Sequence, residues 1–184
     1  MNILAVSFAY PPLAYPRSIQ VARLLKNTEA STALFCAHEP AARRDDTIEP
    51  NASSFLTTCG RIEVKSTASS RLINRLSYRF RRPIWNTRNL APDAYGHWGS
   101  DVIKGVREYL KTGAFQPDII VTFAQPFTDH LIGLELKKEL GLPWLAHFSD
   151  PWVDNPFGSS DEEIQSLNLA LERSVAETAD MLAF

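Results

Sequence analysis

Short apolar runs alternate with longer amphipathic stretches along most of the chain. The runs are rich in Val, Ile, Leu and Phe, a composition typical of strands that are buried on both faces of a parallel sheet. They cover residues 3–8, 32–36, 62–64, 118–123, 143–148 and 179–184, of which 62–64 is the weakest. This alternation predicts an α/β fold, namely a Rossmann-like three-layer α/β/α domain with a mainly parallel sheet.

The intervals between these runs have helical periodicity. Ser18 is expected to cap a helix that turns Ile19 and Leu24 toward the sheet, and Ser100 is expected to cap a helix that ends near residue 111. A third helix is predicted over 128–140, with Gly141 directly after its end. Two more are predicted, over 71–82 and after a capping box that starts at Ser160.

Length and composition favour a single intracellular domain. The chain has 184 residues, of which 45% are hydrophobic and 22% charged, and this suits one domain with a sizeable core. Cys36 and Cys59 lack the spacing of metal ligands, and two thiols in such a domain suggest a reducing compartment. Since the sequence shows neither a basic, apolar leader nor a membrane-spanning run, we expect a cytoplasmic protein.

Three unusual segments follow predicted strands: residues 9–17, 124–129 and 149–157. The carboxyl ends of parallel strands lie at one edge of the sheet, and ligands of α/β proteins bind in the crevice there. We therefore expect these three loops to come together around a ligand site.

The first loop leads from a buried strand into a helix, where free amides and the helix dipole favour an anion. Arg17 could add charge-assisted hydrogen bonds to a phosphate or carboxylate, or could simply be solvated. The loop contains no glycine. This absence argues against a dinucleotide fingerprint and against a P-loop.

The third loop is the densest polar and aromatic cluster in the sequence. Trp152 and Phe157 can form an apolar wall of the kind that sugars stack against, and Asp150 and Asp154 can accept hydrogen bonds from hydroxyl groups. Alternatively, Asp150 caps a turn and Trp152 belongs to the core. His147 directly precedes this loop.

The second loop offers Gln125, Asp129 and His130 at the start of a helix. Asp129 could equally be a favourable contact with the helix dipole, and His130 an exposed bystander. The four histidines form no metal-binding spacing, and no Ser/His/Asp order can be singled out. We therefore expect no metal site and no self-contained hydrolase.

Positive charge gathers in residues 61–91, which contain eight Arg and Lys residues and one Glu, for a net charge of 8 − 1 = +7. Because the whole chain carries −2, the remainder carries −2 − 7 = −9. Apolar side chains beside these arginines favour a peripheral membrane contact through residues 71–88 or an anionic lipid-linked acceptor. A solvated helix face is equally compatible with the pattern. The same charge could attract nucleic acid, which we do not expect as a partner.

Several motifs resemble the N-terminal domain of family-four glycosyltransferases, which have the glycosyltransferase B (GT-B) fold, in the subgroup that makes bacterial surface polysaccharides. The match spans essentially the whole chain through the order and spacing of these motifs. They are Tyr10-Pro11-Pro12, Pro16-Arg17-Ser18, Pro117 to Val121, Gln125-Pro126-Phe127, Gly141 to Trp152 and Ala179 to Leu182. Two loops depart from the family pattern: Ala14, Tyr15 and Pro16 replace the usual glycines of the first loop, and Ser149 replaces an arginine in the third.

The resemblance implies a retaining transfer of a sugar from a nucleotide-diphosphate donor to a glycan or lipid-linked acceptor, with no cofactor and no metal. Residues 1–184 would be the acceptor-side domain, and the C-terminal donor domain would be absent from this chain. Asp150 would be the catalytic residue, and Arg17 and Ser18 would lie near the donor phosphates. The other substrate-binding candidates are Trp152, Asp154, His147, Gln125 and Asp129.

The resemblance implies that the full-length protein would be a hexosyltransferase of polysaccharide biosynthesis, located in the cytoplasm or at the inner face of the cell membrane. This chain alone is expected to be inactive. The alternative is a non-catalytic Rossmann-type binding module, or a partner subunit of a separate donor domain.

Overall fold

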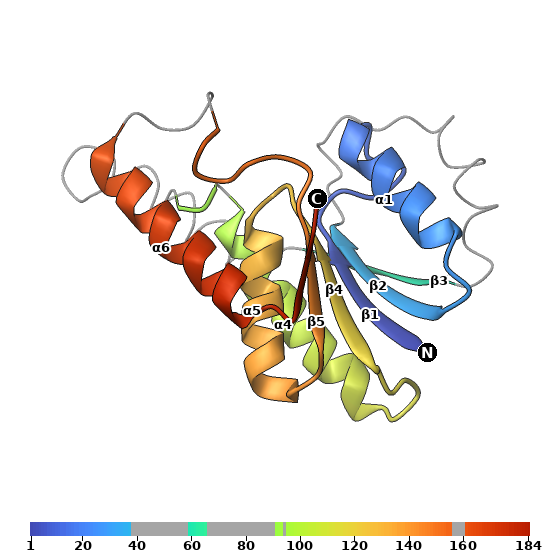
Figure 1. The fold of residues 1–184 in the computed structure, drawn as a ribbon. Helices are drawn as coiled ribbons and strands as arrows, with labels where there is room; N and C mark the ends of the chain where they lie inside the picture. The colour runs from blue at the N-terminus through green and yellow to red at the C-terminus, as the bar shows by residue number, and fades with distance from the viewer. Residues whose placement is uncertain (38–58, 66–90, 94, 156–160) are drawn as a thin grey trace.

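Six parallel strands form one sheet in the computed structural model, which describes residues 1–37, 59–65, 91–93, 95–155 and 161–184 (Figure 1). The strands are β1 (Asn2–Ser7), β2 (Ser31–Ala37), β3 (Cys59–Val64), β4 (Ile119–Phe123), β5 (Trp144–His147) and β6 (Met181–Ala183). The helices are α1 (Pro16–Lys26), α4 (Gly96–Lys111), α5 (Thr128–Leu140) and α6 (Glu162–Thr178). Each predicted strand is present within a few residues of its expected position.

The strand order is β3-β2-β1-β4-β5-β6, and every neighbouring pair of strands is parallel. This is the order of a Rossmann sheet, in which the chain reverses its direction of progress between β1 and β4. The predicted Rossmann-like α/β fold is therefore confirmed, with a fully parallel sheet in the described part of the chain.

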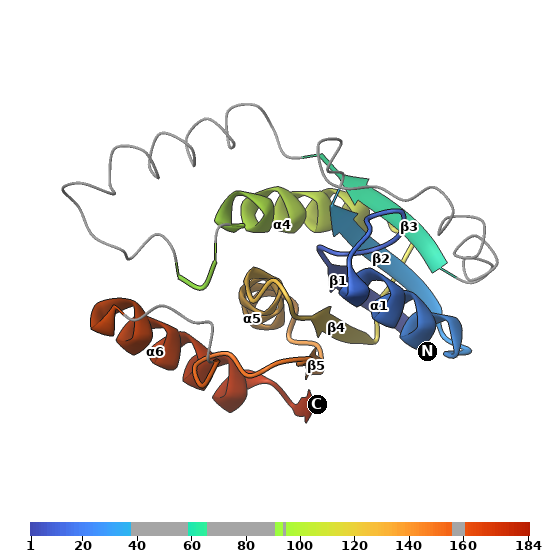
Figure 2. The ribbon, with the colours of Figure 1, turned by 90° about the horizontal axis from the view of Figure 1, so that it is seen from above.

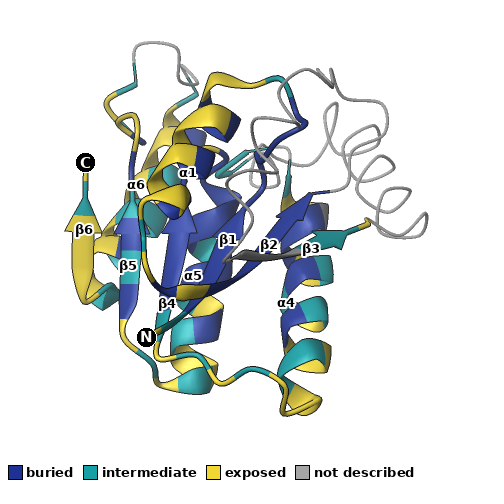
Figure 3. Cartoon of the chain, turned by 90° about the vertical axis from the view of Figure 1, so that its right-hand side faces the viewer, coloured by how far each residue is buried: buried dark blue, intermediate teal, exposed yellow. Residues whose placement is uncertain are grey.

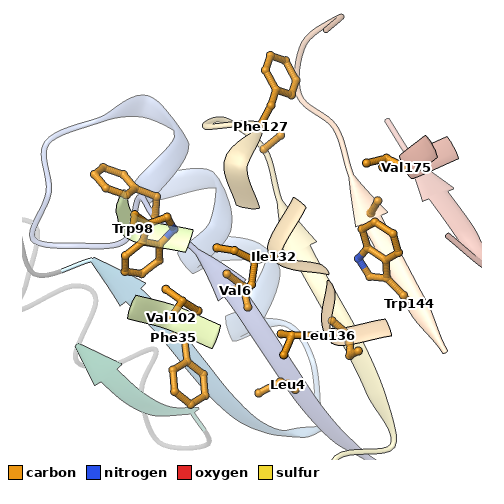
Figure 4. Close-up of a cluster of buried hydrophobic side chains, with 14 of the residues drawn as sticks. Leu4, Val6, Phe35, Trp98, Val102, Phe127, Ile132, Leu136, Trp144 and Val175 are labelled. Carbon is orange, nitrogen blue, oxygen red and sulfur yellow. The ribbon is translucent and has the colours of Figure 1, made fainter. Parts of the chain in front are cut away.

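Two apolar layers sandwich the sheet. In the view from above, α1 covers one face, whereas α4, α5 and α6 lie on the other (Figure 2). Alternate residues of β1 supply the two sides: Leu4 and Val6 pack toward α4 and α5, and Ile3 and Ala5 toward α1. The larger layer also holds the indoles of Trp98 and Trp144 (Figure 4). Burial is concentrated in the central strands and on the inner sides of the helices, whereas β6 at the edge of the sheet is largely exposed (Figure 3).

The start of α1 differs from the prediction. The helix begins at Pro16, which follows the N-cap Tyr15, so Ser18 lies inside the helix and does not cap it. Proline is well suited to the first helical position because it lacks the N–H that would stay unbonded there. The buried face of the helix also differs from the prediction: Arg17 and Ser18 turn inward, whereas Ile19 and Leu24 are exposed.

Two other helix starts also differ. The helix expected from Ser100 begins at Gly96, which brings Trp98 into its first turn, where the indole is fully buried. The cap of α6 is Asp161, whose carboxylate accepts hydrogen bonds from the amides of Glu163 and Ile164. By contrast, α5 has the predicted bounds, and Gly141 ends it in the left-handed conformation at φ 66°.

Some predictions fall outside the described residues. These are the helix over 71–82, the membrane contact through 71–88, Phe157 and the Ser160 capping position. Among the described helices, none combines the length and the apolar character needed to cross a bilayer.

Candidate functional site

A cleft of about 790 Å³ opens at the carboxyl ends of β1, β4 and β5, and the three loops that follow these strands line it. In Figure 1 these loops leave the sheet at the same upper edge. The expectation that they come together is therefore confirmed. Of the predicted site residues, the cleft walls include Arg17, Gln125, Asp150 and Trp152. Ser18, Asp129, His147 and Asp154 are not among its lining residues.

Aromatic rings make up much of the cleft wall. Phe127 and Trp152 stack with their ring centroids 4.7 Å apart and an interplanar angle of 9°. Phe8, Tyr15 and Tyr95 also line the cleft. Trp152 is only 5% exposed, so it is part of a packed wall and does not stand free as a platform.

Helix α6 holds the loop that carries Trp152. The indole Nε1 of Trp152 donates to Oδ1 of Asn168 at 3.1 Å. The backbone amides of Trp152 and Val153 donate to the carboxylate of Glu172, one turn further along the helix. Burial raises the pKa of Glu172, and these two hydrogen bonds oppose that rise. The loop is therefore fixed by side chains of α6, and Asn168 itself lines the cleft.

Asp150 lies at the exposed turn between β5 and Trp152. Its Oδ2 lies 2.8 Å from the hydroxyl of Ser149, and that hydroxyl also lies 3.1 Å from the carbonyl oxygen of Ala124. A serine hydroxyl has one proton, so it serves one of these two acceptors at a time. The Asp150 carboxylate consequently keeps accepting capacity for a ligand hydroxyl group.

Arg17 reaches from α1 across the carboxyl end of the sheet to β5. Its Nη2 donates to Nδ1 of His147 at 2.8 Å and to the carbonyl oxygen of His147 at 3.1 Å, and its Nη1 donates to Gln20 at 3.2 Å. The guanidinium carbon lies 5.8 Å from the centroid of the Phe123 ring. Burial lowers the pKa of Arg17 to about 10, and Asp129 and Asp150 oppose that shift. Arg17 is thus a desolvated cation with neutral hydrogen-bond partners.

His147 is the acceptor in this pair, because an arginine can only donate. Its Nδ1 must therefore carry the lone pair, and the ring proton is on Nε2. Burial and then the charge of Arg17 lower the pKa of His147, which keeps the imidazole neutral at neutral pH.

Asp129 is fully buried beneath the cleft. Its Oδ2 accepts from the amide of Phe8 and its Oδ1 from the indole of Trp98, both at 2.7 Å. Burial raises the pKa of Asp129 to about 8, although the two hydrogen bonds lower it. The carboxyl group thereby joins α5 to the end of β1 and to α4, and a contact between Asp129 and a ligand stays a prediction.

His130 is also fully buried, so the idea of an exposed bystander is wrong. Its Nδ1 lies 2.8 Å from the hydroxyl of Thr122, which accepts a hydrogen bond from Trp144 Nε1 at 3.0 Å. Its Nε2 is buried without a hydrogen-bond partner. Burial, with smaller contributions from Arg17 and His147, lowers the pKa of His130 to about 3. The imidazole is therefore neutral.

The remaining predicted residues lie away from the cleft wall. Ser18 is fully buried in α1, and its hydroxyl has no partner; Asp154 is exposed to solvent. Within the described ranges, no group of three His, Cys, Asp or Glu residues is placed to hold a metal ion.

Several cleft residues lie outside the segments that the sequence singled out: Gln20, Asp93, Tyr95 and Asn168. Asp93 accepts hydrogen bonds from the amide and the hydroxyl of Thr128 and from the amide of Tyr95. It therefore caps α5 from a distant part of the chain. Asp93 precedes the helical pattern of α4, and an acidic residue in such a place often caps the helix that follows it. Nothing in the local sequence indicated that Asp93 would instead cap α5.

Sequence comparison finds no relative: no protein-family model matches the chain, and no curated protein matches it. Solved structures do share its fold. One of them is apo UGT2 of Phytolacca americana, a UDP-glycosyltransferase, with a TM-score of 0.51 and 12% sequence identity over 82% of this chain. The chain spans 30% of the length of UGT2. At this identity the likeness shows the fold alone.

Proposed function

We propose that this chain is the acceptor-binding half of a retaining glycosyltransferase of the family-four type. The full protein would move a sugar from a nucleotide-diphosphate donor to a glycan or lipid-linked acceptor. The observation that carries this proposal is the combination of aromatic rings and hydrogen-bonding side chains in the cleft at the carboxyl ends of β1, β4 and β5.

Sugars present apolar ring faces and rims of hydroxyl groups. The wall that includes Phe8, Tyr95 and Phe127 suits the ring faces. Amide and carboxylate side chains of the cleft can pair with hydroxyl groups; these are Gln20, Gln125, Asp150, Asn155 and Asn168. A volume of about 790 Å³ is within the range of ordinary ligand sites, roughly 300–1,000 Å³. The cleft therefore matches a carbohydrate both in chemistry and in size.

The roles of individual residues follow from their positions. Asp150, with its exposed carboxylate, is the side chain that we propose to contact the reacting hydroxyl group of the acceptor. Arg17 is the cation that we propose to face the donor phosphates when a donor domain is present. Trp152, held by Asn168, would shape the acceptor site through its packed ring.

Two assays on the purified chain test this proposal. We expect glycan binding but no sugar transfer from nucleotide sugars by the chain alone. Gln125→Ala should weaken glycan binding about tenfold, a loss of about 1.4 kcal/mol, whereas the matched variant Gln165→Ala on the exposed part of α6 should bind normally. Transfer by this chain would refute the half-enzyme assignment. If the chain bound nucleotide sugars but no glycan, it would be the donor-binding half of the enzyme and not the acceptor-binding half.

The membrane contact of residues 71–88 is a separate part of the proposal. We expect the chain to float with liposomes that contain anionic lipids and to stay behind with neutral liposomes, because six of the eight positive charges of residues 61–91 lie within residues 71–88. If the chain did not float with anionic liposomes, the proposed membrane contact through residues 71–88 would be wrong.

A further inference from the structure

Asn168 lies on α6 and lines the cleft, and its amide group has a defined direction. The indole Nε1 of Trp152 donates to Oδ1 of Asn168 at 3.1 Å. An indole N–H can only donate, so the oxygen of the amide must face the indole and the nitrogen must face away from it. The protein therefore occupies the carbonyl end of Asn168 and leaves the NH₂ end for other partners.

The NH₂ group of Asn168 supplies two N–H donors. In the part of the chain that the structure describes, this side chain makes one hydrogen bond, and it does so through Oδ1. Asn168 is half-buried at the wall of the cleft. A ligand that displaces water from such a donor without replacing its hydrogen bond loses affinity. A ligand in this part of the cleft is therefore favoured when it brings an acceptor to Asn168.

Three apolar side chains lie close to this donor. Ile164 precedes Asn168 by four residues, so the two share one face of α6, and both line the cleft. Phe127 stacks on Trp152 with the ring centroids 4.7 Å apart. The single polar atom of the Trp152 ring is already bonded to Asn168, so the ring offers the ligand only apolar surface. This corner of the cleft thus combines an N–H donor with an apolar wall.

An acetamido group matches both features at once. Its carbonyl oxygen only accepts hydrogen bonds, and its methyl group gains free energy by packing against apolar side chains. Its N–H is trans to the carbonyl, so it points away from Asn168 when the carbonyl faces that residue. A ring hydroxyl group fits less well, because it carries a proton that the apolar wall cannot accept. An amide carbonyl is also a stronger acceptor than an ester carbonyl.

We propose that Asn168, with Ile164, Phe127 and Trp152, forms a subsite for the acetamido group of an N-acetylated sugar. This inference rests on the proposed function, since it names the class of sugar that the cleft prefers. Asn168 is the specificity-determining residue: its N–H donors select the carbonyl oxygen, and Trp152 keeps them turned away from the protein.

The direct test is a titration of the ¹⁵N-labelled chain, followed by NMR, with two matched pairs of sugars. The pairs are glucose with N-acetylglucosamine, and galactose with N-acetylgalactosamine. We expect at least one N-acetylated sugar to bind about tenfold more tightly than its partner, the combined effect of one hydrogen bond and one buried methyl group. The same sugar should shift the side-chain amide signals of Asn168. Equal affinities within both pairs would overturn the proposal.

A ligand analogue separates the two parts of the subsite. The N-formyl analogue of the preferred sugar keeps the carbonyl oxygen but lacks the methyl group. We expect it to bind with an affinity between those of the N-acetylated and the unsubstituted sugar. This comparison uses the wild-type chain, so it does not depend on whether any variant folds. An analogue that bound no better than the unsubstituted sugar would show that the carbonyl is not recognised.

The variant Asn168→Asp tests the donor itself. The carboxylate has nearly the shape of the amide and still accepts from Trp152 Nε1, but it lacks both N–H donors. It should lose the preference for the N-acetylated sugar while the unsubstituted sugar still binds and circular dichroism shows that the fold is retained. The matched variant Gln165→Glu places the same charge on the exposed part of α6, outside the cleft, and should keep the wild-type preference. A preference that survives in Asn168→Asp would overturn the proposal.

The outcomes also separate this inference from the proposed function. If the unsubstituted sugars bind in the cleft as well as the N-acetylated ones, the carbohydrate site stands and only the acetamido subsite is refuted. If none of the four sugars and no larger glycan binds there, the proposed function falls together with the subsite.

Discussion

The indole N–H of Trp98 donates to Oδ1 of Asp129 at 2.7 Å, and this bond joins the first turn of α4 to the first turn of α5. The other oxygen of Asp129 accepts from the amide of Phe8 at the end of β1. Three elements that surround the cleft therefore meet at one buried carboxyl group. Its protonation should be visible in the stability of the whole domain.

The first prediction concerns Asp129 above neutral pH. Its pKa is raised by burial from 3.8 to about 8 in the folded chain. Between these two pH values the folded state holds a proton that the unfolded chain releases, so the stabilisation is present at lower pH and is lost as the pH rises toward 8. We expect the wild type to lose about 2 kcal/mol of unfolding free energy between about pH 6.5 and pH 8.

Urea denaturation of Asp129→Asn and Asp154→Asn checks this expectation. The Asp129 variant should show little change over that interval, because the titrating group is gone. Asp154 is exposed, and its variant should lose unfolding free energy with pH as steeply as the wild type does. If Asp129→Asn also showed the wild-type loss, the carboxyl group of Asp129 would not titrate in this pH interval.

The second prediction has the opposite sign and concerns His130. Burial lowers its pKa from 6.5 to about 3. Below pH 6.5 the unfolded chain therefore takes up a proton that the folded chain does not, and stability is lost as the pH falls. In the wild type, folded Asp129 already holds a proton in this pH range that the unfolded chain lacks, and this difference opposes the loss.

The variant His130→Gln, which cannot titrate, should separate the two effects. Relative to the wild type, we expect it to gain about 3 kcal/mol of unfolding free energy on acidification from about pH 6.5 to pH 4. Chemical denaturation at these two pH values measures that difference. Parallel pH profiles for the two proteins would contradict the neutral, buried imidazole.

A third prediction concerns the packing of α5 on β5. A Cβ atom on Gly133 would lie 2.5 Å from Nε1 and Cε2 of Trp144, a fully buried ring. The ring would have to move, and its hydrogen bond to Thr122 would be strained. We therefore expect Gly133→Ala to destabilise the fold by about 1–3 kcal/mol.

Gly105→Ala is the matched control for that variant. Gly105 lies inside α4, and its nearest side-chain atom would be 3.7 Å from the added Cβ, an ordinary contact. Helix propensity should then stabilise this variant by up to about 1 kcal/mol. Thermal denaturation of the two variants gives the comparison, and equal melting temperatures would refute the close packing of Gly133 on Trp144.

The sequence predicts the sheet and its binding edge well, because both depend on local patterns. The apolar runs locate the strands. Because the strands are parallel, the loops that follow them, residues 9–17, 124–129 and 149–157, lie at the same edge of the sheet. The orientation of α1 was not accessible in this way. Arg17 and Ser18 share the buried face of α1 with Val21, Ala22 and Leu25. Whether two polar residues or Ile19 and Leu24 turn toward the sheet depends on tertiary packing.

Contacts between distant segments were also beyond prediction. Asp129 is separated from its partner Phe8 by 121 positions, and Asp93 from Thr128 by 35. The local sequence of a polar residue at the start of a helix is equally compatible with three roles: binding a ligand, interacting with the helix dipole, or making buried hydrogen bonds to other elements. Burial decides between these, and burial of polar side chains follows from the assembled fold and not from their local sequence.

The central claim is that a carbohydrate binds in the cleft at the carboxyl ends of β1, β4 and β5. NMR mapping of the ¹⁵N-labelled chain with a glycan that binds tests it most directly. We expect signal changes at the amides of Gln125, Ser149 and Asp150, which line the cleft, and none at Thr112 and Ala114, which follow the far end of α4. Changes confined to residues away from the cleft, with Gln125 and Asp150 unaffected, would contradict it.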